Sequence, residues 1–184
     1  MTTDELPIAT ERLILRRFED RDIEAFVDYR CDPQIARYQS WSEFDAAEAR
    51  VFILDQRTVS FAAPNQWFQI AVADISTNRL LGDMGVCVRS NGNVAEIGFT
   101  LGRHVQGRGI AFEGVRRVLR LIFETTAVER VEATTDLRNT ASMRLLSRLE
   151  FSQIKIESAR FKGETCDEAT YELRRADWQQ TRDG

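Results

Sequence analysis

The chain has 184 residues, of which 43% are hydrophobic and 29% are charged, and its formal net charge at neutral pH is −4. This length and balance favour one globular domain, expected to span residues 1–184 with a core from about residue 10 to residue 173. The mild negative charge argues against a nucleic-acid partner, because phosphate-binding surfaces need a clustered positive excess. No apolar run approaches the roughly 20 residues that span a bilayer, which argues against a membrane partner.

The N-terminal residues and the cysteines predict a cytoplasmic protein. Asp4 and Glu5 stand where a secretory signal would carry positive charge. A reducing compartment also suits the cysteines, which are odd in number and widely spaced: Cys31, Cys87 and Cys166. Because the sequence has no Cys-x-x-Cys pair and one histidine, His104, it predicts no metal site.

The first third of the chain is expected to form one strand and two helices. Residues 11–18 are rich in β-forming side chains and predict a strand. Asp20 is a candidate N-cap for a helix with four residues at helical spacing, Ile23, Phe26, Val27 and Arg30. Pro33 either ends this helix or opens the next turn. A second helix is expected over residues 45–57, with five partly buried side chains: Ala46, Ala49, Val51, Phe52 and Ile53.

Three strands are expected in the middle of the chain, at residues 66–73, 80–88 and 94–101. A polar turn at 74–78 separates the first two. The sequence Ser90-Asn-Gly-Asn93 predicts a hairpin before the third, because Asn-Gly supports positive φ at both turn positions.

The C-terminal third predicts helix, strand, helix and a closing hairpin. One apolar stripe defines the first helix: Ala111, Val115, Val118, Leu119 and Ile122. A strand at 128–135, a helix from about Asn139, and two strands at 151–161 and 166–173 follow. The whole order predicts an α/β fold with a mixed (α+β) sheet rather than regular strand–helix alternation.

The segment from Leu101 to Ala111 joins a strand to a helix and contains Gly107 and Gly109. Glycines let the backbone approach a ligand closely, and a helix N-terminus attracts phosphate. Arg103 and Arg108 would add to that field. The dinucleotide fingerprint fails, since it would need a third glycine where Phe112 stands, and no Gly-Lys-Ser/Thr follows the loop. The remaining pattern is Gln106-x-x-Gly109-x-Ala111; the alternative is that the glycines merely turn the loop into the helix.

That pattern resembles the pyrophosphate loop Q/R-x-x-G-x-G/A of the GNAT acetyltransferases. Three further blocks match in order: residues 10–18 resemble the opening strand of the ribosomal-protein-alanine N-acetyltransferase branch, residues 95–101 resemble its fourth strand, and residues 139–151 resemble its N-x-x-S-x-x-x-L-x-x-x-G-F helix. The likeness covers roughly residues 10–173.

The resemblance implies a splayed sheet that holds acetyl-CoA as cosubstrate. Pantetheine would pair with the main chain of Phe99, Thr100 and Leu101, and the pyrophosphate would bind at the loop residues Gln106, Gly107, Arg108, Gly109, Ile110 and Ala111. Asn139 would contact the cosubstrate and Ser142 would protonate the departing thiolate. Asn139 suits a helix N-cap equally well, and Ser142 could instead be a small packing residue.

Glu96 is the first candidate for the general base, because strand alternation puts it on one face with Gly98 and Thr100. The alternative is a charged residue on a solvated sheet face. Where close relatives carry a carboxylate on the sixth strand, this chain offers Arg160, with Glu157 out of register. A second departure is Glu150, which stands in place of the usual glycine before Phe151. His104 is expected to be a surface residue.

The predicted function is acetyl-CoA-dependent acetylation of an amine, with a non-catalytic acyl-CoA-binding protein of the same fold as the rival. The closest resemblance implies the α-amine of a protein N-terminus, while acetylators of small amines share the same loop. Residues 37–41 are expected to wall the acceptor side, although Tyr38 and Trp41 could equally be core aromatics. A homodimer is compatible with the sequence, which does not determine the oligomeric state.

Overall fold

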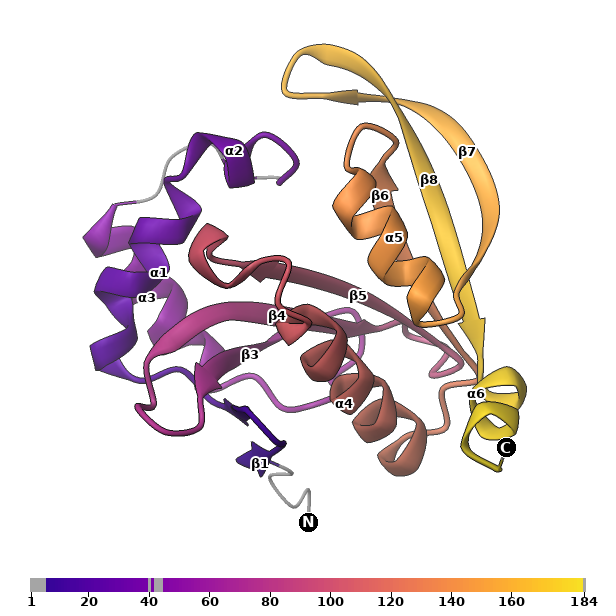
Figure 1. Ribbon diagram of the computed structural model, residues 1–184, viewed down its shortest axis with the longest axis horizontal. Coiled ribbons are helices and arrows are strands. Elements are labelled where there is room, and N and C mark those ends of the chain that lie inside the picture. Colours follow the sequence, from indigo (N-terminus) through magenta and orange to yellow (C-terminus); the bar gives the residue numbers. More distant parts are fainter. Residues whose placement is uncertain (1–5, 40, 42–44, 184) are drawn as a thin grey trace.

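The computed structural model describes residues 6–39, 41 and 45–183, and Figure 1 shows their arrangement. Asp4, Glu5 and Ser40, which entered the sequence-based expectations, lie outside the described residues. The strands form one eight-stranded sheet, ordered β1 (Ile8–Ala9), β2 (Leu13–Arg16), β3 (Trp67–Asp74), β4 (Leu80–Val88), β5 (Val94–Leu101), β6 (Arg130–Asp136), β8 (Glu164–Arg174) and β7 (Ser152–Phe161).

Helices cover both faces of this sheet. They are α1 (Ile23–Arg30), α2 (Pro33–Ala36), α3 (Ala46–Gln56), α4 (Ile110–Thr125), α5 (Thr140–Arg148) and α6 (Arg175–Asp183). The helices α4 and α5 share one apolar core with alternate residues of β3, and α1 packs with α3 in a second core that includes the intervening Ala71. The two cores therefore lie on opposite faces, since neighbouring strand residues point to opposite sides. The predicted mixed α/β fold is confirmed.

The strands β5 and β6 form the parallel pair of the sheet, and their pairing is short. It joins Val94–Glu96 to Arg130–Glu132, whereas β5 continues to Leu101 and β6 to Asp136. Beyond Glu96 the two strands diverge (Figure 1). The backbone groups of β5 that face this gap have no partner on β6, so the splay offers unpaired donors and acceptors to a ligand.

Several local expectations were wrong. Asp20 is not the N-cap of the helix that carries Ile23: a 3-10 turn (Asp20–Asp22), itself capped by Glu19, precedes α1, and the N-cap residue of α1 is Asp22. For Pro33 the second of the two alternatives agrees with the structure, because it opens the next element, a separate helix, α2, which Asp32 caps. On α3, Val51 is 59% exposed and Ala46 is also exposed, so the buried stripe is narrower than predicted.

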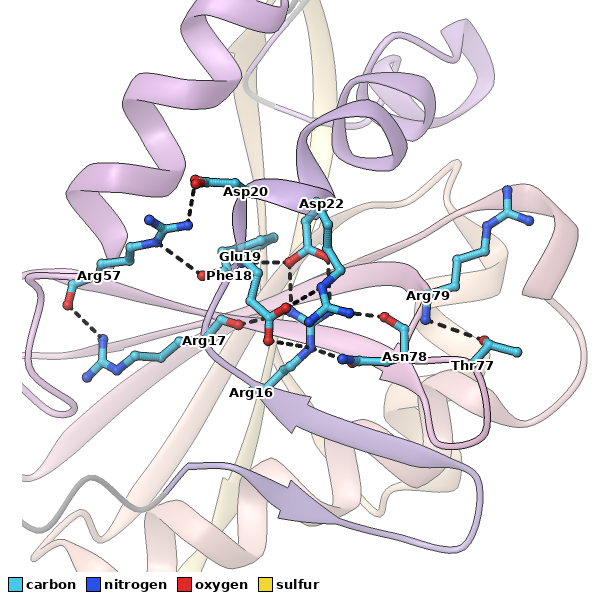
Figure 2. Close-up of polar contacts among 11 residues, drawn as sticks. Arg16, Arg17, Phe18, Glu19, Asp20, Asp22, Arg57, Thr77, Asn78 and Arg79 are labelled. Atoms are coloured by element: carbon cyan, nitrogen blue, oxygen red, sulfur yellow. Dashed lines mark hydrogen bonds and ion pairs between the residues drawn. The ribbon is translucent and has the colours of Figure 1, made fainter.

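A buried ion pair ties the end of β2 to the 3-10 turn that precedes α1 (Figure 2). The Arg16 guanidinium donates from Nη1 to Asp22 Oδ2 at 2.7 Å and from Nη2 to Asp22 Oδ1 at 2.9 Å, and its Nε donates to Asn78 Oδ1 at 2.7 Å. Both charged side chains are almost fully buried. Removing one partner would leave the other charge uncompensated in the interior.

Candidate active site

A cavity of about 470 Å³ lies at the diverging ends of β5 and β6. Its walls come from the end of β5, the glycine loop, the first turn of α4, one side of α5 along its length and the segment around α2. Most residues predicted for the cosubstrate line it: Phe99, Thr100, Leu101, Gln106, Gly107, Gly109, Ile110, Ala111, Asn139 and Ser142. Two predicted residues, Arg108 and Glu96, are not in its lining.

The glycine loop presents a row of unpaired N–H groups. Gly107 and Gly109 have φ of 71° and 78°, a conformation that L side chains rarely adopt, so glycine is required to shape this turn. Among the described residues, the N–H groups from Gly107 to Phe112 donate no hydrogen bond, and the first helical bond runs from Glu113 N–H to the Gly109 carbonyl. These donors and the helix dipole suit an anion such as a diphosphate.

Arg12, on the turn before β2, connects this loop to the first turn of α4 through hydrogen bonds. Its Nη1 donates to the Arg108 carbonyl at 2.8 Å, and its Nε donates to Glu113 Oε2 at 2.6 Å. Thr10 also donates to Glu113. Burial raises the pKa of the Glu113 carboxyl, but the hydrogen bonds from Thr10 and Arg12 outweigh it and the net pKa is lowered. The Arg108 carbonyl is thereby occupied by Arg12, which does not line the cavity.

At the other wall, Asn139 caps α5 by accepting from the Ser142 N–H at 3.2 Å. The N-cap interpretation of Asn139 is therefore correct, and both residues also line the cavity. Gln106 has an internal bond as well, because its Nε2 donates to the Leu101 carbonyl at 2.9 Å and closes the loop onto the end of β5.

Glu96 is the last residue of β5 paired with β6, and its side chain is half-buried on the face that also carries Thr100. It makes no hydrogen bond or ion pair with another described residue. Burial raises the pKa of the Glu96 carboxyl, Arg89 lowers it, and the neighbouring Glu132 raises it again, so the net pKa is above the usual value. A carboxylate so placed has a pKa moved toward neutral pH, as a general base requires.

Sequence reasoning missed two arginines that line the cavity, Arg144 and Arg148 on α5. Their i, i+4 spacing on the helix next to Ser142 was the available signal. Together with Arg103 they give the cavity positive charge, although Arg103 also pairs with Asp32 at 3.5 Å.

The two aromatic residues near α2 were expected either to wall the acceptor side or to pack in the core, and they differ in this respect. Tyr38 lines the cavity and its hydroxyl donates to the Arg138 carbonyl at 3.3 Å. Trp41 instead packs on the Arg30 guanidinium, 3.8 Å from the ring centre, and donates to the Arg30 carbonyl. His104 is exposed, as expected.

Within the part of the chain that the structure describes, no helix is both long and apolar enough to cross a membrane. Nor do these described residues contain a group of three or more side chains suited to hold a metal ion.

Comparison with known proteins identifies the family. Residues 12–152 match the acetyltransferase (GNAT) domain. The chain is 33% identical over 147 residues to the uncharacterized N-acetyltransferase p20 of Bacillus licheniformis, covering 78% of this chain and 81% of the relative. It is 24% identical over 155 residues to the [ribosomal protein uS5]-alanine N-acetyltransferase of Escherichia coli strain K12, covering 79% and 78%.

A solved structure has the same fold. Spermidine N-acetyltransferase from Vibrio cholerae, in complex with CoA and spermine, aligns with a TM-score of 0.79 at 16% identity, covering 92% of this chain and 99% of that chain. The splayed mixed sheet with a glycine loop at the mouth of its cavity is that of an acyltransferase. The chain belongs to the GNAT acetyltransferase family.

Proposed function

We propose that the protein is an acetyl-CoA-dependent N-acetyltransferase that transfers the acetyl group directly to a primary amine, either of a protein N-terminus or of a small molecule. The observation that carries this proposal is the row of unpaired N–H groups from Gly107 to Phe112, beside a cavity that continues into the splay of β5 and β6. We further infer that the chain works as one domain in the cytoplasm, where its three free cysteines stay reduced.

The residues present fit acetyl-CoA. The loop N–H groups, with Arg144 and Arg148, suit the diphosphate and its negative charge. The edge of β5 at Phe99, Thr100 and Leu101, which β6 does not pair, suits the pantetheine amides, with the Leu101 carbonyl already accepting from Gln106 Nε2. Bound in this way, acetyl-CoA supplies an activated acyl group at the splay.

The chemistry then needs two proton transfers. As the new N–C bond forms and the C–S bond breaks, Glu96 accepts the proton that leaves the amine, directly or through water, because its pKa is raised and its carboxylate is otherwise unpaired. The Ser142 hydroxyl, on the first turn of α5 at the cavity wall, supplies the proton that the departing sulfur takes up.

A non-catalytic acyl-CoA-binding protein remains the rival, and turnover decides between the two. Purified protein is incubated with acetyl-CoA and a panel of amines, including a peptide with an N-terminal alanine and linear alkylamines. Free CoA thiol and the acetylated amine are measured together. We expect equal amounts of both, and a much slower rate in Ser142→Ala. CoA binding without product from any amine would support the rival.

A further inference from the structure

Two glycines face each other across β4 and β5, on the sheet face opposite α4 and α5. Gly85 and Gly98 are register partners, and neither has positive φ, so the backbone does not require glycine at either position. The two positions differ in what covers them. A methyl group on Gly85 would come within 2.8 Å of the Gln69 amide nitrogen and 2.9 Å of the Trp67 ring. A methyl group on Gly98 would meet only Trp67 Cζ3, at 4.0 Å.

The indole of Trp67 therefore lies across Gly85 and ends beside an open space above Gly98. This side chain is 40% exposed although it is large and apolar. We call this space the Gly98 trough; its sides are Trp67, Gln69 and Glu96, and its floor is the Gly85–Gly98 pair. The clearance of 4.0 Å is one van der Waals contact, so a slender chain could lie on Gly98 with one side against the ring.

The trough is electron-rich. The Glu96 carboxylate is half-buried and has no ion-pair partner among the described residues. The nearest cation, Arg89, is held by Glu132 at 2.6 Å. Cys87, which lies opposite Glu96 on β4, is an uncharged thiol whose pKa is raised by burial and by Glu96. An indole face and an unpaired carboxylate together attract an ammonium group on an apolar stem.

The trough lies next to the cavity described above along β5. Thr100 lines that cavity and lies two residues from Gly98 on the same face of β5. Glu96, two residues in the other direction, stands where β5 and β6 begin to diverge. A group in the trough would therefore lie beside the gap through which the acyl group is proposed to be presented.

We propose that the Gly98 trough is the acceptor subsite, and that it selects a primary amine on an unbranched aliphatic stem, with the methylenes against Trp67 and the nitrogen beside Glu96. This inference rests on the proposed function and deepens it. A substituent on the carbon that bears the amine would collide with either the indole or the floor, and the described residues that form the trough include no cation for the carboxylate of a free amino acid.

The test uses two isomers of one composition, n-butylamine and sec-butylamine, with acetyl-CoA as donor. We expect wild-type kcat/KM to be at least about tenfold higher for the unbranched isomer, the discrimination that one misplaced methyl group produces in a shaped pocket. Gly98→Ala should raise the KM for n-butylamine by about tenfold, because its methyl group occupies the stem's path while making only an ordinary van der Waals contact with Trp67. Trp67→Leu, which removes the aromatic face from a partly exposed position, should raise it similarly.

CoA affinity, measured by calorimetry on the same variants, separates the subsite from the proposed function. It should be unchanged in Gly98→Ala and Trp67→Leu, since neither residue lines the cosubstrate cavity. Equal rates with both isomers, faster turnover of an N-terminal alanine peptide than of any linear amine, or an unchanged KM in Gly98→Ala would overturn the acceptor subsite and leave acetyl transfer intact. Failure of the wild-type protein to bind CoA would instead contradict the proposed function itself.

Discussion

Replacing Gly109 by tryptophan separates the effect of backbone strain from the effect on the cosubstrate cavity. Gly109 has φ of 78°, so any L side chain there costs about 1–2 kcal/mol of stability. A side chain would also start 3.4 Å from Arg12 Nη2. The indole must therefore either displace Arg12 from the Arg108 carbonyl or turn into the cavity, and both outcomes disturb the loop N–H groups.

The expected loss of CoA affinity follows from these donors. Hydrogen bonds to a charged group contribute about 1.5–3 kcal/mol each, so losing two of them costs about 3–6 kcal/mol. This corresponds to a Kd that rises by about 10² to 10⁴-fold. Isothermal titration calorimetry with CoA measures the change directly, and thermal denaturation measures the strain.

Gly92→Trp is the matched control, because Gly92 has φ of 74° in the hairpin before β5, has open space around it and does not line the cavity. Both variants should lose similar stability, and only Gly109→Trp should lose CoA affinity. Unchanged CoA affinity in Gly109→Trp, or an equal loss in both variants, would refute the reasoning.

Four other variants probe the site and the scaffold. Ser142→Ala should slow turnover by about 10²-fold or more with CoA affinity nearly unchanged; normal turnover per folded molecule would return Ser142 to a packing role. Glu96→Gln should depress the rate most at neutral pH, with a deficit that shrinks as the amine loses its proton unaided; a ratio to wild type that stays flat between about pH 6 and 9 would refute the base assignment. Because its pKa is raised in the folded state, the charged Glu96 costs stability at neutral pH, so the same variant should not melt earlier. Glu150→Gly should gain about 1 kcal/mol in chemical denaturation, since Glu150 has φ of 66° at the end of α5; no gain would mean that its side-chain contacts offset the strain. Asp22→Ala should lose about 3–5 kcal/mol, because the buried Arg16 would keep only the longer ion pair to Glu19 at 3.9 Å, whereas a loss below about 1 kcal/mol would mean that water reaches the pair.

The order of strands and helices could be predicted because it depends on local patterns. Periodicity located β3, β4, β5 and α4 to within a residue or two. In contrast, α6 was not predicted, because Trp178 is its one buried residue among those with a described side chain and no apolar periodicity results. The strand β1 was not predicted either, because it has only two residues. Glu150 is informative in hindsight, because the family pattern that the sequence resembles has glycine at this position, where this chain holds a non-glycine residue at φ of 66°.

The site was predictable where a motif is contiguous and unpredictable where residues meet through the fold. The glycine loop and the Asn139 helix are local patterns, and the structure brings them to one cavity, while their roles stay predictions. The contact from Arg12 to Arg108 spans 96 residues, and the pairing of Gly85 with Gly98 depends on the register of two strands. Such contacts arise from strand pairing and packing, which the residue pattern alone does not specify.

A crystal structure of the protein with bound CoA tests the central claim most directly. We expect the diphosphate to accept hydrogen bonds from the N–H groups between Gly107 and Ala111, and the pantetheine to run along the open edge of β5. The thiol should then lie in the splay between β5 and β6, within reach of Ser142. CoA bound outside this cavity, or bound within it with the loop N–H groups unused, would contradict the account.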